Sequence, residues 1–274
     1  MPTLFSPVFC ARIALLAAML CLSWAARAAD LRIGGTGNAL GTMRLLGEAF
    51  ARAHPETKPL ILASIGTSGA FKALPKGAID IGVSSRMPTE EEKQAGLSAI
   101  EYARSPTVFA VQNSNRVAGI SLSQLEEVYS GKLTTWPDGT RIRPIMRQPG
   151  DDNTRQIKQL SPEIEQAVGH AEQQPGLAFA VTDQDAADKM ELIPGSLGVS
   201  TLALIRSENR RLRPLMLGAV APSMDNARSG RYPLVKHFYF VLPQEPTRAA
   251  QAFVKFVKSP PARKILEQNG HFIP

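Results

Sequence analysis

Cysteine is nearly absent from this chain of 274 residues. Its two cysteines, Cys10 and Cys21, both lie within the first 28 residues, which have the pattern of a cleavable secretory signal. Once that segment is removed, the exported chain would contain no cysteine. We therefore exclude disulfide bonds, thiol nucleophiles and thiolate metal sites from it.

The N-terminal segment itself predicts export. Arg12 precedes an apolar run, Ile13–Leu22, which is about half of the roughly 20 residues that a membrane-spanning helix needs. Ala26-Arg27-Ala28 then supplies the small residues of a signal peptidase site. We predict cleavage after Ala28 or Ala29 and release into the periplasm. An uncleaved membrane anchor and lipidation at Cys21 are the alternatives.

Aromatic residues and histidine are also scarce, and their scarcity disfavours several functions. Aromatic side chains form 6% of the chain, whereas a nucleic-acid binder combines a basic face with interleaved aromatic residues. The histidines are scattered and form no His-x-x-x-His pattern or triad signature: His54, His170, His237 and His271. We predict no nucleic-acid partner, no metal, no cofactor and no enzymatic activity.

Strand-like and helix-like patterns alternate along the chain. We expect strands at 31–34, 59–63, 79–83, 107–111, 142–146, 200–205, 213–217 and 235–242. We expect helices at 40–53, after the capping box Thr89-Glu-Glu-Glu92, through most of 152–190, and at 247–258 and 261–269. This alternation predicts an α/β architecture with largely parallel sheets.

Three turns rich in glycine and hydroxyl groups each lie between a predicted strand and a predicted helix. They are Gly34–Asn38, Gly66–Gly69 and Gly150–Thr154. A helix start presents unpaired N–H groups and the positive end of the dipole, and glycine lets an anion approach. One such turn is weak evidence, because strand–helix turns need glycine anyway. Three in one chain, with Arg147 just before the third, predict a site for a small anion.

Seven motifs also follow one another in a recognisable order and spacing. They are Ile33-Gly-Gly-Thr-Gly-Asn-Ala-Leu40, Gly66-Thr-Ser-Gly69, Asp80-Ile-Gly-Val-Ser-Ser-Arg86, Ser130-Gly-Lys132 with Trp136, Pro194-Gly-Ser-Leu-Gly198, Tyr232-Pro-Leu234 and Ser259-Pro to Gly270. Together they resemble the phosphate-binding components of bacterial ABC transporters, within the type II periplasmic binding protein superfamily. The resemblance covers nearly the whole chain after the leader.

This resemblance implies a two-lobed type II periplasmic binding protein fold. Each lobe would be a mostly parallel sheet flanked by helices, and crossover strands would join the lobes around a buried ligand. On this basis we assign residues 1–28 to the signal peptide, 29–113 and 236–274 to lobe 1, and 114–235 to lobe 2.

The resemblance also implies, residue by residue, a set of groups around a bound oxyanion. They are Thr36, Gly37, Asn38 and Ala39 in the first turn, Thr67, Ser68 and Gly69 in the second, and Arg147, Asn153 and Thr154 around the third. Asp80 would accept the proton of a hydrogen phosphate and so disfavour sulfate, which has no proton to offer. The structural alternatives are a helix-capping or salt-bridged role for Asp80 and a rim ion pair for Arg147.

Two departures from the family pattern bear on the ligand. The third loop normally reads serine-glycine-threonine, whereas this chain has Asp152-Asn153-Thr154 with Asp151 adjacent. A carboxylate about 4 Å from an anion costs about 4 kcal/mol at an effective dielectric near 20. Either Asp152 turns outward as a helix N-cap, or the ligand carries donors or positive charge. Ala39 stands where a hydroxyl is often found, although Asn38 offers a substitute donor.

The leader, the three turns and the family resemblance together imply an exported, monomeric solute-binding protein. It would capture a small oxyanion, with phosphate favoured, for a membrane ABC permease. One alternative is a receptor on the same fold that acts on a periplasmic sensor domain. Another is a binder of a different oxyanion or a substituted anion.

Overall fold

The computed structural model describes residues 29–148 and 150–274, so the predicted leader 1–28 and both cysteines lie outside the described residues. The first elements are β1 (Ala29–Gly35), α2 (Gly37–Ala53), β2 (Thr57–Ile61), α3 (Gly66–Ala73), β3 (Ile81–Ser84) and α4 (Glu90–Gln94). They form strand–turn–helix units, as the alternating pattern predicts.

The long strand β4 (Ser98–Gln112) leads into the second group of elements. These are β5 (Gly119–Ile120), α5 (Leu122–Tyr129), β6 (Arg143–Arg147), α6 (Asp152–Lys158), α7 (Pro162–Gln173), β7 (Ala178–Ala180), α8 (Asp183–Leu192), β8 (Ser196–Thr201), α9 (Leu202–Ser207), β9 (Leu212–Pro214), β10 (Met216–Leu217) and α10 (Met224–Arg228). Strand β11 (Val235–Leu242) then returns to the first group, and α11 (Arg248–Val257) and α12 (Pro260–Gln268) end the chain.

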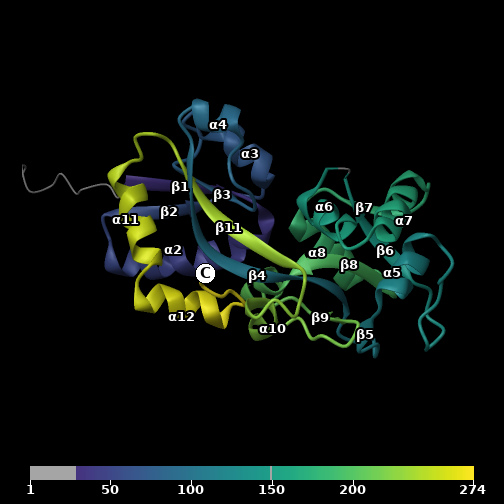
Figure 1. Cartoon of the computed structure of the whole chain (residues 1–274). Coiled ribbons are helices and arrows are strands. Elements are labelled where there is room, and N and C mark those ends of the chain that lie inside the picture. The colour runs from purple at the N-terminus through teal and green to yellow at the C-terminus, as the bar shows by residue number, and fades with distance from the viewer. Residues whose placement is uncertain (1–28, 149) are drawn as a thin grey trace, which may run out of the picture.

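Strands β4 and β11 connect the two groups. Among the described residues, one nine-stranded sheet has the order β2-β1-β3-β11-β4-β8-β6-β7, with β9 also paired to β4. The first half of β4 pairs with β11, and its second half pairs with β8 and β9, all antiparallel. The outer pairs on each side are parallel. Figure 1 shows β4 and β11 running together between the two groups of elements.

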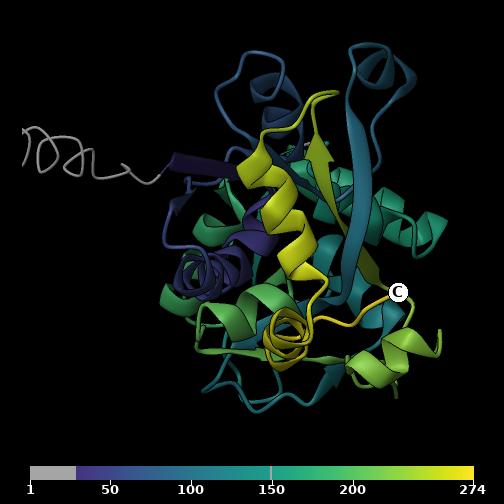
Figure 2. The ribbon, with the colours of Figure 1, turned by 90° about the vertical axis from the view of Figure 1, so that its left-hand side faces the viewer.

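The buried side chains fall into two corresponding sets. The first core lies between β1, β3, β11 and the helices α2, α11 and α12, and its residues come from 31–103 and 238–266. Figure 2 shows α11 and α12 beside α2, where Phe50 and Phe253 pack edge to face with ring centroids 5.2 Å apart. The second core draws its residues from 108–234. This separation supports the predicted lobe boundaries, which remain a proposal.

The α/β class is confirmed, and most predicted elements occur in their places. One expectation was wrong: 200–205 is not a strand, because β8 ends at Thr201 and α9 begins at Leu202. The hydroxyl of Thr201 accepts a hydrogen bond from the N–H of Leu204 and so caps α9. The sheet is also less parallel than expected, since the central pairs are antiparallel.

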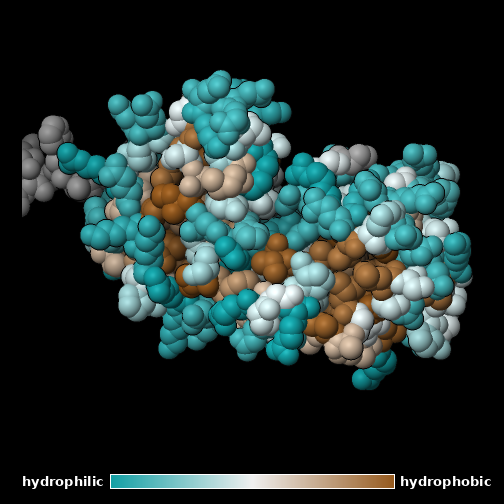
Figure 3. All heavy atoms as spheres, viewed as in Figure 1, coloured by the Kyte–Doolittle hydropathy of each residue, from teal (hydrophilic) through white to brown (hydrophobic). Residues whose placement is uncertain are grey.

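The described surface is largely polar. Figure 3 shows a mainly hydrophilic face whose larger hydrophobic area lies over the region of β8 and α5. Across residues 29–148 and 150–274, every helix is too short or too polar to traverse a lipid bilayer.

Candidate functional site

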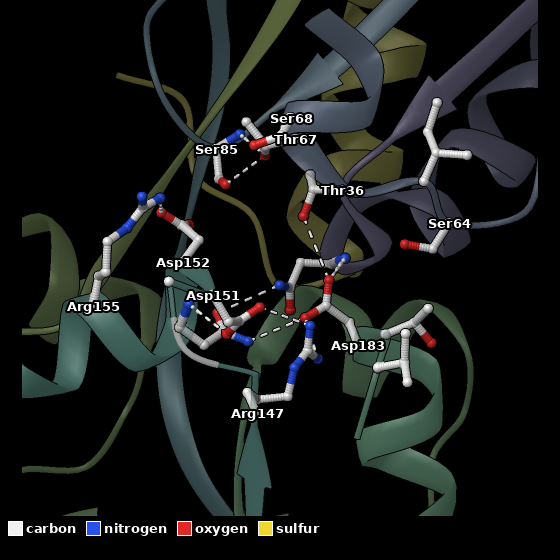
Figure 4. Close-up of a pocket in the computed structure, with 17 residues that line it drawn as sticks. Thr36, Ser64, Thr67, Ser68, Ser85, Arg147, Asp151, Asp152, Arg155 and Asp183 are labelled. Atoms are coloured by element: carbon white, nitrogen blue, oxygen red, sulfur yellow. Dashed lines mark hydrogen bonds and ion pairs between the residues drawn. The ribbon is translucent and has the colours of Figure 1, made fainter. Parts of the chain in front are cut away.

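A cavity of about 260 Å³ lies where the two groups of elements face each other (Figure 4). It is lined by Thr36, Asn38, Ser64, Ile65, Gly66, Thr67, Ser68, Ser85, Arg147, Gly150, Asp151, Asp152, Asn153, Arg155, Val181, Thr182 and Asp183. The three predicted turns therefore meet at one place. Of the predicted site residues, Thr36, Asn38, Thr67, Ser68, Arg147 and Asn153 line the cavity. Gly37, Ala39, Gly69, Asp80 and Thr154 do not.

The first turn depends on a glycine. A Cβ on Gly35 would lie 1.9 Å from the carbonyl oxygen of Val83, so only glycine lets β1 run this close to β3. The N–H of Thr36 then donates to that same carbonyl at 2.9 Å. Helix α2 begins one residue later, which turns its N-terminal N–H groups toward the cavity.

A carboxylate that the sequence did not single out lies at the centre of the site. Oδ2 of Asp183 accepts from the backbone N–H of Asn38 at 3.0 Å and from the Thr36 hydroxyl at 3.5 Å. Oδ1 of Asp183 accepts from Nη1 of Arg147 at 2.9 Å and from Nδ2 of Asn153 at 3.1 Å. We call these four donors the cradle. They come from both sides of the cavity and converge on one anionic group (Figure 4).

Arg147 lies between two carboxylates. Its Nη2 donates to Oδ2 of Asp151 at 2.7 Å, opposite the contact that Nη1 makes with Asp183. Arg147 is 8% exposed, so this charge is held largely out of water by its two partners. Burial raises the pKa of the Asp151 carboxyl, and the negative charge of the neighbouring Asp183 carboxylate raises it further. The positive charge of Arg147 lowers this pKa but does not offset burial.

Asp151, and not Asp152, caps α6. Oδ1 of Asp151 accepts from the N–H groups of Asn153 and Thr154 at 3.0 and 3.2 Å. The capping role predicted for Asp152 was therefore assigned to the wrong neighbour. These two N–H groups are therefore already hydrogen-bonded within the protein, and Thr154 does not line the cavity.

Asp152 lines the cavity but has its own cations. Its Oδ2 lies 2.6 Å from the amine of Lys236 and its Oδ1 lies 3.2 Å from Nη2 of Arg155. Burial alone would raise the pKa of Asp152, but Lys236 and hydrogen bonds from Ser85 and Arg155 outweigh it and lower that pKa. The repulsion expected from Asp152 is thus largely neutralised within the protein.

Two hydroxyl-bearing segments form the facing wall. The Thr67 hydroxyl at the start of α3 lies 2.9 Å from the Ser85 hydroxyl and accepts from the Ser85 N–H at 3.1 Å. Ser64 and Ser68 add further hydroxyls. Ser85 belongs to the Asp80–Arg86 motif, in which the family resemblance implied a role for Asp80 and not for Ser85.

The expected position of Asp80 was wrong. Its carboxylate accepts from the N–H, Nε and Nη2 of Arg32 at 2.7, 3.1 and 2.9 Å, outside the cavity. Burial alone would raise the pKa of the Asp80 carboxyl. The hydrogen bonds and the charge of Arg32 outweigh burial, so the pKa lies below its ordinary value. The structural alternative, a salt-bridged aspartate, describes Asp80. Arg86 likewise pairs with Glu92, through contacts of 2.7 Å.

Comparison with known proteins places this chain in a family. The model of the PBP superfamily domain matches residues 23–261. The "Phosphate-binding protein PstS 2" of Streptococcus pneumoniae is 33% identical over 106 residues, and the match covers 39% of this chain and 36% of that protein, about a third of its length. The "Phosphate-binding protein PstS" of Bacillus subtilis is 22% identical over 254 residues, covering 89% of this chain and 80% of that protein.

The fold is found again in a crystal structure from Clostridium perfringens, assigned as a phosphate ABC transporter substrate-binding protein and containing bound phosphate. The two chains share 22% identity with a TM-score of 0.74, and the superposition covers 89% of this chain and 99% of the other. At this identity the likeness shows the fold, and the family model adds the membership. This chain therefore belongs to the PBP superfamily and has the α/β fold of the type II periplasmic binding proteins.

Proposed function

We propose that this protein is an exported solute-binding protein that captures phosphate for an ABC transporter. The observation that carries the proposal is the cradle, in which four hydrogen-bond donors from both sides of one cavity converge on a single anionic group. The names of the relatives and the phosphate bound in the Clostridium perfringens structure support phosphate as the oxyanion.

The chemistry of the cavity suits a small hydrated anion. The N–H of Asn38 lies at the positive end of the 17-residue helix α2, and Arg147 adds a planar cation with two donor nitrogens. The hydroxyls of Ser64, Thr67, Ser68 and Ser85 line the opposite wall, where they donate to a phosphate oxygen or accept from its proton.

The carboxylates of the cavity favour a protonated oxyanion. Asp151 and Asp152 line it beside the cradle, and a carboxylate accepts a hydrogen bond but donates none. Hydrogen phosphate can donate its proton to one of them, whereas sulfate places acceptor against acceptor. Selection against sulfate would thus come from these residues and not from Asp80.

The remaining parts of the proposal rest on the sequence. The leader at residues 1–28 would direct the chain to the periplasm, and a membrane permease would receive the ligand from a monomeric receptor.

A thermal-shift screen with phosphate, sulfate, molybdate, phosphonates and amino acids tests the proposal. A ligand present at 100 times its Kd stabilises the folded state by about 2.7 kcal/mol, which is readily visible as a rise in melting temperature. We expect phosphate to give the largest rise and sulfate to give none at the same ionic strength. An equal response to sulfate, or a response to amino acids alone, would contradict the proposal.

The Asp80→Asn variant tests the corrected site. Because Asp80 pairs with the partly exposed Arg32 outside the cavity, we expect phosphate affinity and the rejection of sulfate to remain unchanged. The free energy of unfolding should fall by about 1 kcal/mol, since the ion pair is weakened. Calorimetric titration and urea denaturation measure the two effects. A loss of discrimination between phosphate and sulfate would return Asp80 to the site.

A further inference from the structure

Asp183 takes up the whole cradle. Both of its carboxylate oxygens are used, one on the N-terminal side of α2 and one on Arg147 and Asn153. Its side chain is 9% exposed, so these contacts are made away from bulk water. An oxyanion that needs the same four donors therefore meets an anion of the protein already bound to them.

The position of Asp183 is not explained by the needs of its own helix. Thr182 is the N-cap of α8, and its hydroxyl accepts from the N–H of Asp185. Asp183 is the next residue, and its side chain accepts across the cavity from Thr36 and Asn38, 147 and 145 residues away in the sequence. An aspartate in a first turn is favourable for the helix dipole, but that preference does not require the carboxylate to reach α2.

The packing around α2 also accommodates this side chain. A Cβ on Gly37 would lie 2.9 Å from Oδ2 and from Cβ of Asp183, and 2.3 Å from Oε1 of Gln184. Nε2 of Gln184 donates to the carbonyl of Gly37 at 2.9 Å beside it. Because Gly37 has no Cβ, the start of α8 can pack directly against the start of α2.

From this geometry we propose that Asp183 is an internal competitor for the oxyanion. Its carboxylate occupies the cradle in the ligand-free protein, and the oxyanion binds by displacing it. The proposal rests on the proposed function for the identity of the incoming anion. Asp183 would therefore weaken the affinity for the oxyanion, so that a higher oxyanion concentration is needed to saturate the protein.

A second consequence concerns the two sides of the cavity. Asp183 belongs to the second group of elements, whereas Asn38 and Thr36 belong to the first. The internal carboxylate therefore bridges the two sides of the cavity in the way that a bound ligand would.

The test compares phosphate binding by the unaltered protein with that of the Asp183→Ala variant. Removal of the competitor should tighten the calorimetric Kd for phosphate by about tenfold or more, because charge-assisted hydrogen bonds no longer have to be broken first. Asp183→Asn should change it in the same direction, since its amide nitrogen cannot accept from the donors of the cradle. Asp188→Asn is the matched control, because it removes one charge from the exposed side of the same helix and should leave the Kd unchanged.

Formate provides a readout that does not depend on phosphate. Its carboxylate should fill the space left in Asp183→Ala and raise the melting temperature of that variant, but not that of the unaltered protein, against sodium chloride at equal ionic strength. If neither protein binds phosphate while formate stabilises the variant alone, the proposed function is wrong and the internal competitor stands. If phosphate binds the variant no more tightly than the unaltered protein, the competitor proposal is overturned and the proposed function stands.

Discussion

Replacing Arg147 by alanine is expected to lower both the phosphate affinity and the free energy of unfolding. Arg147 contacts Asp151 and Asp183 at 2.7 and 2.9 Å and is 8% exposed. Without it, two carboxylates are left in a largely desolvated site with no cation between them. Removing one partner from a buried ion pair typically costs about 3 to 5 kcal/mol of stability. Loss of the same cation from the site should weaken phosphate binding by about a hundredfold or more.

Two further variants separate these effects. Lysine should restore little, because its single ammonium group cannot reach both carboxylates with the geometry of a guanidinium. The double variant Arg147→Ala with Asp183→Ala should be less unstable than the two single changes predict together, since it leaves only one carboxylate unpaired. Urea denaturation of the four proteins gives this coupling. Additive effects, or an unchanged phosphate Kd in Arg147→Ala, would contradict the central position of Arg147.

The sequence identified the side of the site that local structure builds. Thr36, Asn38 and Thr67 lie at strand–turn–helix junctions, where glycine and hydroxyl residues stand close together in the sequence. Such junctions have a local signature because the turn and the helix start need particular residues. Arg147 was found for the same reason, since it ends the strand that precedes the third turn.

Asp183 had no such signature. It follows the three-residue strand β7, which the sequence analysis absorbed into a mostly helical region from 152 to 190. An aspartate in the first turn of a helix is also an ordinary preference and draws no attention. Its place in the candidate site comes from contacts with Thr36 and Asn38, at sequence separations of 147 and 145 residues. No local pattern contains that information.

The error at Asp80 has a different origin, namely the direction of a strand. Strands β1 and β3 are parallel, with Ile33 opposite Ile81, and the cavity lies at their carboxyl ends. Ligands in α/β sheets bind at that end. Asp80 precedes β3 and so lies at its amino end beside Arg32, whereas Ser85 follows β3 and lines the cavity. The residue of this motif that lines the cavity is therefore the one that follows the strand, not the one that precedes it.

Acid is expected to destabilise the protein through a buried histidine that does not line the cavity. His271 is fully buried beside Tyr102 and Phe238, and its Nε2 lies 2.9 Å from the Thr42 hydroxyl. Burial lowers the pKa of His271 to about 3 from its ordinary value of 6.5. As the pH falls from about 6.5 toward about 3, His271 takes up a proton in the unfolded chain but not in the folded protein. The unfolding free energy should therefore fall by about 1.4 kcal/mol per pH unit once the pH is below about 6.5.

The His271→Gln variant separates this effect from that of the carboxylates. Glutamine does not titrate, so the variant should lose about 2 to 3 kcal/mol less than the unaltered protein between pH 7 and pH 4.5, whatever its stability at pH 7. Carboxylates with lowered pKa values act mainly below this range, and the raised pKa of Asp151 acts in the opposite direction in both proteins alike. The control is His170→Gln, which makes the same substitution at a solvent-exposed histidine of α7. Urea denaturation at a series of pH values gives the slopes, and equal slopes for His271→Gln and the unaltered protein would show that His271 is protonated in the folded state.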